Sequence, residues 1–318
     1  MMRIAEILLN SWGNLEFNMH VPVLLQEAIE ALNLAPGKKV IDATVGDGGH
    51  TLEVIKRIEP AGTLIAIDLD LVALKTVQAK LNTTAKVILV HDNFKNLKQI
   101  ALANEVGAVD AILLDLGWRR TQFEESGLGF SFLRDEPLDM RFGRGEEKNQ
   151  VLTAALIVNN WTTDELIKLF RDYGDERLAG EITKRIVAAR RVAPISRSGE
   201  LVEIILATYR EKLGSKKEIP WIGGLHPATK VFQALRIAVN DELENLKTVL
   251  PDCIELLAKN GRLAVISFHS LEDKIVKQYF KYNKKIKLIT KKAIQADEAE
   301  VVANPPSRSA KLRVVEKI

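Results

Sequence analysis

Acidic and glycine residues gather where two predicted strands end. Asp42 lies near the end of the apolar run 39–44 and is followed by the glycine cluster 46–49, and Asp68 ends the run 63–68. Glycine lets backbone N–H groups approach a ligand closely, because it carries no Cβ. A carboxylate at the end of the next strand can accept hydrogen bonds from both hydroxyls of a ribose. Together the two features indicate a nucleotide-like ligand.

The spacing within the glycine cluster narrows the choice of ligand. A dinucleotide site favours G-x-G-x-x-G, but Thr51 stands where the third glycine belongs. Asp42, Gly46 and Gly48 instead form D-x-x-x-G-x-G, which resembles the loop that binds S-adenosylmethionine in class I methyltransferases. We therefore expect S-adenosylmethionine as cofactor, with the alternative that 46–49 is a plain tight turn.

A third predicted strand ends in the string HDNF. Here Phe94 could pack on an adenine face, and Asp92 could accept a hydrogen bond from the adenine amine. Strand ends that meet in an open α/β sheet line one ligand site. The alternative, in which Asp68 and Asp70 merely end a solvated strand, would require three independent coincidences.

These strand ends require a parallel sheet to bring them together. Apolar runs at 39–44, 63–68, 86–92 and 111–117 alternate with amphipathic segments at 49–58 and 71–81. Continuous Val, Ile and Leu runs suit strands that are covered on both faces, and their alternation with helices predicts right-handed parallel crossovers. The fold class is therefore α/β, with a doubly wound sheet.

The alternation stops after the fourth predicted strand. Between 121 and 225 we find amphipathic helical segments and no convincing strand, which indicates an inserted helical domain. The pattern then resumes with a long helix over 230–258, which Pro251 should divide or kink. A strand over 261–270, a basic helix over 271–283 and closing strands at 285–290 and 310–318 follow. The predicted division of the chain is 1–120 and 226–318 for the α/β domain and 121–225 for the insertion.

Composition sets further limits. The chain has 318 residues, of which 47% are hydrophobic and 27% charged, enough for one large core or two smaller ones. No apolar run approaches the ~20 residues of a membrane span, and the N-terminus does not resemble a signal peptide, so we expect a cytoplasmic protein. The single Cys253 excludes an internal disulfide, and the five histidines lack metal-ligand spacing, so we expect no metal.

Several strings along the chain are shared with one known family. They run in the family's order from about His20 to the C-terminus, and SFHSLED and PLDMR are specific strings among them. The others include HVPVLLQEAI, DATVGDGGHT, AIDLD, LLDLG, YGDERLAGEI, TKVFQALRIAVNDELENL and NPPSRSAKLR. On these strings the chain resembles the RsmH (MraW) family.

The resemblance implies a fold, a reaction and a set of binding residues. Members of that family use S-adenosylmethionine to methylate N4 of a cytidine in small-subunit ribosomal RNA, and they have a Rossmann-like class I methyltransferase fold with an inserted helical domain. The positions that match the family's cofactor-binding residues are Gly48, Gly49, His50, Asp68, Phe94, Asp115 and Gln122. The chain departs from the family after LDLG, where a small residue and two serine-like residues are replaced by Trp118, Arg119 and Arg120.

Asp115 and Trp118 are the predicted catalytic residues. The lone pair of cytosine N4 is delocalised into the ring, so a group that accepts the N4 hydrogens and an aromatic face that fixes the base would do most of the catalysis. Amino-methylating enzymes of other families carry D-P-P-Y after the fourth strand, and 115–118 keeps the acid and the aromatic without the prolines. In the alternative, Asp115 touches only the amino-acid end of the cofactor and Trp118 packs beneath the insertion.

Basic residues indicate where RNA would bind. Eight lysines fall within 274–292, interleaved with three aromatic residues, a composition that suits phosphate neutralisation beside base stacking. Helical phasing could equally place the aromatic residues in the core and leave the lysines solvated. The predicted RNA-binding residues are Arg119, Arg120, Arg141, Lys281, Lys284 and Lys285, and we expect them to surround one crevice.

Two motifs and two rival functions remain open. His269, at the end of the fifth predicted strand, could contact RNA or be structural, and 304–307 is expected to form a loop near the cofactor. The expected partner is ribosomal RNA or the small ribosomal subunit, with a homodimer left open. A small-molecule methyltransferase and a non-catalytic RNA-binding assembly factor are the alternatives, the second motivated by the change at 118–120.

Overall fold

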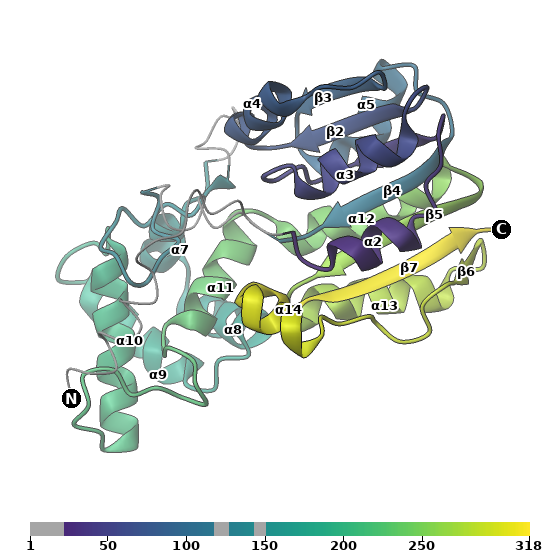
Figure 1. The fold of residues 1–318 in the computed structure, drawn as a ribbon. Coiled ribbons are helices and arrows are strands. Elements are labelled where there is room, and N and C mark those ends of the chain that lie inside the picture. The colour runs from purple at the N-terminus through teal and green to yellow at the C-terminus, as the bar shows by residue number, and fades with distance from the viewer. Residues whose placement is uncertain (1–21, 118–126, 143–150) are drawn as a thin grey trace.

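The protein is built around a mixed seven-stranded sheet. The computed structural model describes residues 22–117, 127–142 and 151–318. The strand order is β3-β2-β1-β4-β5-β7-β6, in which β7 is antiparallel to both of its neighbours and the other pairs are parallel (Figure 1). The strands are β1 (Lys39–Asp42), β2 (Thr63–Asp68), β3 (Lys86–His91), β4 (Val109–Asp115), β5 (Leu257–Ser267), β6 (Ile286–Leu288) and β7 (Lys311–Lys317). The predicted Rossmann-like α/β fold is confirmed.

Helices cover both faces of this sheet. One layer holds α2 (Leu25–Ala31), α3 (Gly49–Ile58) and α4 (Leu71–Lys80), and the other holds α5 (Leu97–Ala103), α12 (Glu242–Leu256) and α13 (Ser270–Tyr282). Successive residues of a strand point to opposite faces. Accordingly, Leu113 belongs to the core of the first layer, whereas Ile112 and Leu114 belong to the core of the second. Burial on both faces is why these strands are continuously apolar.

A second group of helices has a core of its own. It comprises α7 (Ala154–Asn160), α8 (Thr163–Gly174), α9 (Ala179–Arg190), α10 (Ser198–Leu213) and α11 (Thr229–Val239). Thr162 and Glu165 form a capping box at the start of α8, and Phe170 is fully buried. The same core includes residues 228–239, beyond position 225. The domain limits at 120 and 225 stay a prediction, and we propose the helical group as the inserted unit.

The prediction of one long helix over 230–258 that breaks at Pro251 is wrong. The break lies at Asn240 and Asp241, between α11 and α12, and α12 continues through Pro251. Asp241 has a left-handed backbone with φ of 50°. The Asn240 side chain accepts a hydrogen bond from the Phe142 N–H and donates to the Met140 carbonyl, each over 2.8 Å. These side-chain bonds fix the junction of α11 and α12 to a distant segment.

The C-terminal segment returns to the sheet beside α2. The helix α14 (Glu298–Ala303) is followed by the 3-10 helix η3 (Pro305–Ser309), which occupies part of the predicted loop 304–307. The Leu24 N–H donates to Oε1 of Glu300 over 2.8 Å, which joins α14 to the start of α2 (Figure 1). Among the described residues, no helix combines the length and apolar character needed to cross a membrane.

Candidate active site

Three carboxylates lie at the carboxyl ends of adjacent parallel strands. β1 lies between β2 and β4, and Asp42 pairs in register with Ala66 of β2 and Leu113 of β4. Asp68 and Asp115 are each two residues beyond those partners. At about 3.3 Å per residue, they extend roughly 6–7 Å farther along the sheet than Asp42. The sheet therefore brings the three acids together, with Asp42 as the recessed member.

Asp42 supports the glycine loop from beneath. It is fully buried, and its Oδ1 accepts the Thr44 N–H over 3.2 Å while Oδ2 accepts the Thr51 hydroxyl over 2.6 Å. The pKa of Asp42 is raised to about 7, mainly by burial and to a lesser extent by the charges of Asp115 and Asp68, against the lowering effect of the two hydrogen bonds. Thr51, which occupies the third-glycine position of the dinucleotide pattern, is thus the residue that fixes Asp42.

The glycines of the loop are required by backbone conformation and by close packing. Gly48 has φ of 84°, and a Cβ on it would lie 2.4 Å from Cγ2 of Val77. A Cβ on Gly49 would lie 2.0 Å from Cγ of Pro22. The loop thereby brings the first turn of α3 close to both neighbours.

Asp68 joins the glycine loop to the end of β2. Its Oδ2 accepts the Gly46 N–H over 2.8 Å and its Oδ1 accepts the Asp70 N–H over 2.7 Å. Asp70 instead caps α4, since its side chain accepts the Val72 N–H. The two acids therefore have different roles, and Asp68, the one predicted to contact the cofactor, is the one beside the loop.

The segment after β3 is a tight turn. Asp92 Oδ1 accepts the Asn93 N–H over 2.6 Å and the Asn96 side-chain amide over 2.8 Å. Phe94 begins the 3-10 helix η1 (Phe94–Asn96) and packs, partly buried, against the core that includes α5 and α12. Both predicted adenine-binding residues are thus partly exposed at the carboxyl end of β3.

Asp115 is held at the end of β4 by a bond to the segment that follows β1 and by a bond within its own turn. Its N–H donates to Oγ1 of Thr44 over 2.7 Å, and its Oδ1 accepts the Gly117 N–H over 3.3 Å. Oδ2 lies 3.5 Å from Nδ1 of His50, a side chain only 6% exposed, whereas that of Asp115 is 20% exposed. A buried imidazole therefore supports the predicted catalytic carboxylate. Sequence reasoning did not assign roles to Thr44 and Thr51, because their partners lie on other elements.

His269 is the N-cap of α13. Its Nδ1 accepts the Glu272 N–H over 3.4 Å, and Glu272 Oε2 accepts the N–H groups of Phe268 and His269 in return. Since Nδ1 is an acceptor, the neutral ring carries its proton on Nε2. The capping contacts favour the structural role among the two that the sequence left open.

One ligand atom each of Glu242, His269 and Glu272 lies within 4.8 Å of the others, as in a metal site. Glu242 already receives both guanidinium bonds of Arg236, over 2.8 and 2.9 Å, and the Nε2 proton of His269 blocks the lone pair that a metal would need. The donor set is therefore used within the protein, and we assign no metal to it.

Arg141 lies in a segment that is fixed to the junction of α11 and α12. Its neighbours Met140 and Phe142 are the residues bonded to Asn240. Its guanidinium donates to both carboxylate oxygens of Asp139, each over 2.7 Å, and this pairing raises the pKa of Arg141. Asn240 precedes Glu242, which lies close to His269 at the end of β5. Arg141 is thus carried near the carboxyl ends of the strands.

The three lysines that we predicted to bind RNA, Lys281, Lys284 and Lys285, are at the opposite end of the sheet. Lys311 pairs with Ser267 at the carboxyl end of β5, so β7 runs away from the strand ends, and Ile286 pairs with Lys317 where β7 finishes (Figure 1). Lys281, Lys284 and Lys285 immediately precede Ile286 and therefore lie at the amino edge. The structure does not bring them to the site at the strand ends.

The aromatic residues of this run are divided between core and surface. Phe280 is 4% exposed and belongs to the core, and Tyr279 packs partly against it. Tyr282 is 73% exposed, with Nζ of Lys281 5.2 Å from its ring centroid. The core interpretation therefore holds for Phe280 and Tyr279, whereas Tyr282 stays exposed beside a lysine, as the RNA-binding interpretation requires. The remaining predicted residues, Trp118, Arg119, Arg120 and Gln122, lie outside the described residues.

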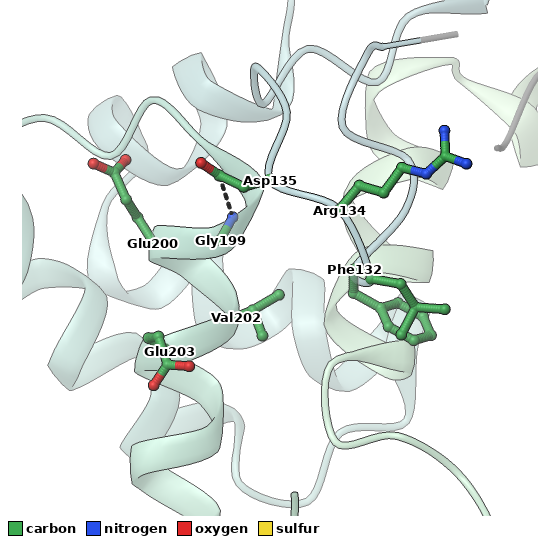
Figure 2. Close-up of a pocket in the computed structure, with 8 residues that line it drawn as sticks. Phe132, Arg134, Asp135, Gly199, Glu200, Val202 and Glu203 are labelled. Atoms are coloured by element: carbon green, nitrogen blue, oxygen red, sulfur yellow. Dashed lines mark hydrogen bonds between the residues drawn. The ribbon is translucent and has the colours of Figure 1, made fainter. Parts of the chain in front are cut away.

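An open pocket of about 360 Å³ lies in the helical group, between the segment 132–135 and the first turns of α10 (Figure 2). Asp135 accepts the Gly199 N–H there over 3.0 Å. Glu200 and Glu203 also line it, so the pocket carries more acidic than basic side chains. This composition opposes phosphate binding and separates the pocket from the predicted RNA contacts.

Comparisons with known proteins show a family match over almost the whole chain. Residues 17–318 match the model of the MraW methylase family. A protein of Symbiobacterium thermophilum named ribosomal RNA small subunit methyltransferase H is 44% identical, over 94% of this chain and 96% of that relative. A protein of Acetivibrio thermocellus with the same name is also 44% identical, over 94% of this chain and 99% of that relative.

Proposed function

The chain belongs to the MraW methylase family, and from this premise we propose that it methylates N4 of a cytidine in small-subunit ribosomal RNA. Its cofactor is S-adenosylmethionine. The single observation that carries the proposal is the position of Asp115, a partly exposed carboxylate at the end of β4, beside a glycine loop and two further acids. We propose the cytoplasm, where ribosomal RNA is assembled into subunits, as its place of action.

The residues at the strand ends fit the cofactor by the chemistry of their donors and acceptors. The N–H groups of the glycine loop suit its amino-acid end, Asp68 suits the ribose hydroxyls, and Asp92 with Phe94 suits the adenine. When bound, S-adenosylmethionine supplies a methyl group on a positively charged sulfur. Nearby carboxylates favour that positive charge, which is lost once the methyl group has left.

Asp115 is proposed to act on the nucleophile. An exocyclic amine attacks poorly while its lone pair is shared with the ring, and a carboxylate that accepts one N4 hydrogen increases the electron density on nitrogen. The Asp115 N–H donates to Oγ1 of Thr44, and the Gly117 N–H donates to Oδ1 of Asp115, so the residue is held in position for the reaction. The same carboxylate is then placed to take the proton that the methylated amine loses.

Arg141 and the lysines at 281, 284 and 285 are the proposed RNA contacts. Arg141 stands near the strand ends, whereas the lysines could reach only a part of the RNA about one helix length away, since α13 spans roughly 20 Å. The proposed substrate is thus an extended RNA or a subunit. The homodimer stays a prediction.

The proposal is tested with the purified protein and small ribosomal subunits from cells that lack the enzyme. Incubation with methyl-labelled S-adenosylmethionine, followed by digestion to nucleosides, should yield labelled N4-methylcytidine. D115A, which retains the rest of the fold, should yield none. Label found in a different nucleoside, or in metabolites and not in RNA, would overturn the proposal in favour of another methyl acceptor.

A further inference from the structure

The His50 side chain connects α2 to the end of β4. Its Nε2 lies 3.2 Å from the Val23 carbonyl oxygen, and its Nδ1 lies 3.5 Å from Oδ2 of Asp115. The side chain is 6% exposed, and His50 lies in the first turn of α3. The two contacts place the histidine between a backbone acceptor and the proposed catalytic carboxylate.

The Val23 contact determines which nitrogen can titrate. A backbone carbonyl can only accept a hydrogen bond, so Nε2 must carry a proton in every state that keeps this contact. In the neutral ring, Nδ1 then presents its lone pair toward Asp115. In the charged ring, Nδ1–H instead faces the carboxylate as an ion pair. One proton therefore distinguishes the two states of the His50–Asp115 pair.

We propose that His50 is the positioning residue that receives, through Asp115, the proton released from the methylated amine. This inference rests on the proposed function. The N4 lone pair forms the new N–C bond as the C–S bond breaks, and the electron pair of the broken C–S bond stays on sulfur. One N4–H bond then breaks, its electron pair returns to nitrogen, and the proton moves to Asp115. From Oδ2 the proton passes to Nδ1 of His50, which restores the carboxylate.

The surroundings allow both states of the imidazole. Asp42 from β1, Asp68 from β2, Asp92 after β3 and Asp115 from β4 are acidic groups at this end of the sheet, and the Asp115 carboxylate is the one that lies 3.5 Å from the ring. On the α2 side the ring meets the Val23 carbonyl, and Glu300 of α14 bonds the next residue of that segment. Burial opposes the charge. Asp115 is partly exposed and so offers the route by which the proton reaches water.

A pair of isosteric variants separates the two contacts of the ring. In H50Q the amide nitrogen falls near the position of Nε2 and can still donate to Val23, but the titrating group is gone. In H50N the amide falls near Nδ1 and can still donate to Asp115, again without titration. At saturating cofactor and RNA, both should lower kcat about tenfold. The rise of kcat with pH that the wild-type histidine produces should be absent from both.

A second measurement is independent of RNA and cofactor. Long-range proton–nitrogen NMR of the labelled enzyme should show a neutral His50 ring protonated on Nε2, with Nδ1 as the titrating nitrogen; loss of the signal in H50Q assigns it among the five histidines. In D115N, this titration should move to lower pH, because the imidazolium loses an opposite charge. A neutral ring protonated on Nδ1, or a midpoint unchanged in D115N, would overturn the pairing.

The outcomes distinguish this inference from the proposed function. If the wild type forms N4-methylcytidine while folded H50Q and H50N keep full kcat and the wild-type pH profile, the proton role of His50 is refuted and the function stands. If the wild type forms no N4-methylcytidine, the proposed function fails, whatever the NMR shows. Circular dichroism and melting temperature of the variants establish that they are folded.

Discussion

The backbone N–H of Gly46 donates to Oδ2 of Asp68 over 2.8 Å, so the loop after β1 is fixed by the acid that ends β2. A single carboxylate thereby shapes the glycine loop and stands where the ribose is expected. Loss of Asp68 should for this reason affect the cofactor through two routes at once, the shape of the loop and the hydroxyl contacts.

In D68A, we expect the affinity for S-adenosylmethionine to fall at least tenfold, as measured by calorimetry. The lost charge-assisted bonds contribute roughly 1.5–3 kcal/mol, and 1.4 kcal/mol corresponds to a factor of ten. D70A is the matched control, because Asp70 caps α4 and should cost about 1 kcal/mol of stability without weakening the cofactor. Equal affinity in D68A and the wild type would remove Asp68 from the site.

Asp42 should make the stability of the fold fall as the pH rises. Its pKa is raised from 3.8 to about 7 by burial, so between these values the folded state holds a proton that the unfolded state has released. The resulting penalty is absent below pH 4, grows through this window and is constant above it, reaching up to roughly 4 kcal/mol.

D42N removes this penalty and can keep both contacts, since its oxygen can accept the Thr44 N–H while its amide donates to Thr51. Relative to the wild type, the variant should therefore gain stability progressively between pH 4 and pH 7. Urea unfolding at each pH, with equal m-values for the two proteins, measures the difference. If the difference in unfolding free energy between D42N and the wild type stays constant from pH 4 to pH 7, Asp42 is ionised throughout this range.

The positions of the acids could be predicted, because they depend on local pattern and on a general rule of parallel sheets. Asp42, Asp68 and Asp115 each end an apolar run, and parallel strands bring such ends to one edge. The bonds that define their roles could not be predicted. Whether Asp68 or Asp70 faces the loop depends on the turn that follows β2, which the carboxylates themselves stabilise.

Long-range contacts account for the predictions that differ from the structure. The break at Asn240 arises from bonds to Met140 and Phe142, about a hundred residues away, and the 3.6-residue periodicity continues through it. The lysines at 281–285 lie at the amino edge because α13 starts at the carboxyl end of β5 and runs back along the sheet for roughly 20 Å. The charge pattern of the sequence does not show at which end of a helix the ligand site lies.

The triple variant K281E/K284E/K285E tests whether that edge binds RNA. If each lysine contacts a phosphate, affinity for the subunit should fall and the slope of log K against log salt should decrease by up to about three. Because the lysines are far from the strand ends, kcat at saturating RNA should be unchanged.

The control for this variant is K56E/K75E/K80E, which changes the net charge equally on exposed positions of α3 and α4. A filter-binding titration at several salt concentrations compares the two. An equal loss of RNA affinity in both triple variants would mean that the lysine-rich run contributes only through its general positive charge. No effect in either would mean that the run is a solvated surface.

Asp115→Asn tests the chemistry most directly, because it keeps the size of the side chain and removes the charge. The variant can still accept the Gly117 N–H, and Thr44 still fixes its backbone. If Asp115 draws on the N4 hydrogens and takes the proton, kcat at saturating cofactor should fall about 10²–10⁴-fold. The cofactor KM should then change only a few-fold, since the lost interaction acts in the transition state.

If Asp115 instead only binds the cofactor, D115N should show the opposite kinetic pattern. A contact with the amino-acid end of the cofactor would raise the KM for S-adenosylmethionine and leave kcat nearly intact. The wild-type melting temperature should persist in D115N, because the side chain is partly exposed and its neighbours keep their bonds. Steady-state kinetics with saturating subunits and varied cofactor decide between the two. A raised KM with unaltered kcat would assign Asp115 to binding and leave the proton transfer to another group.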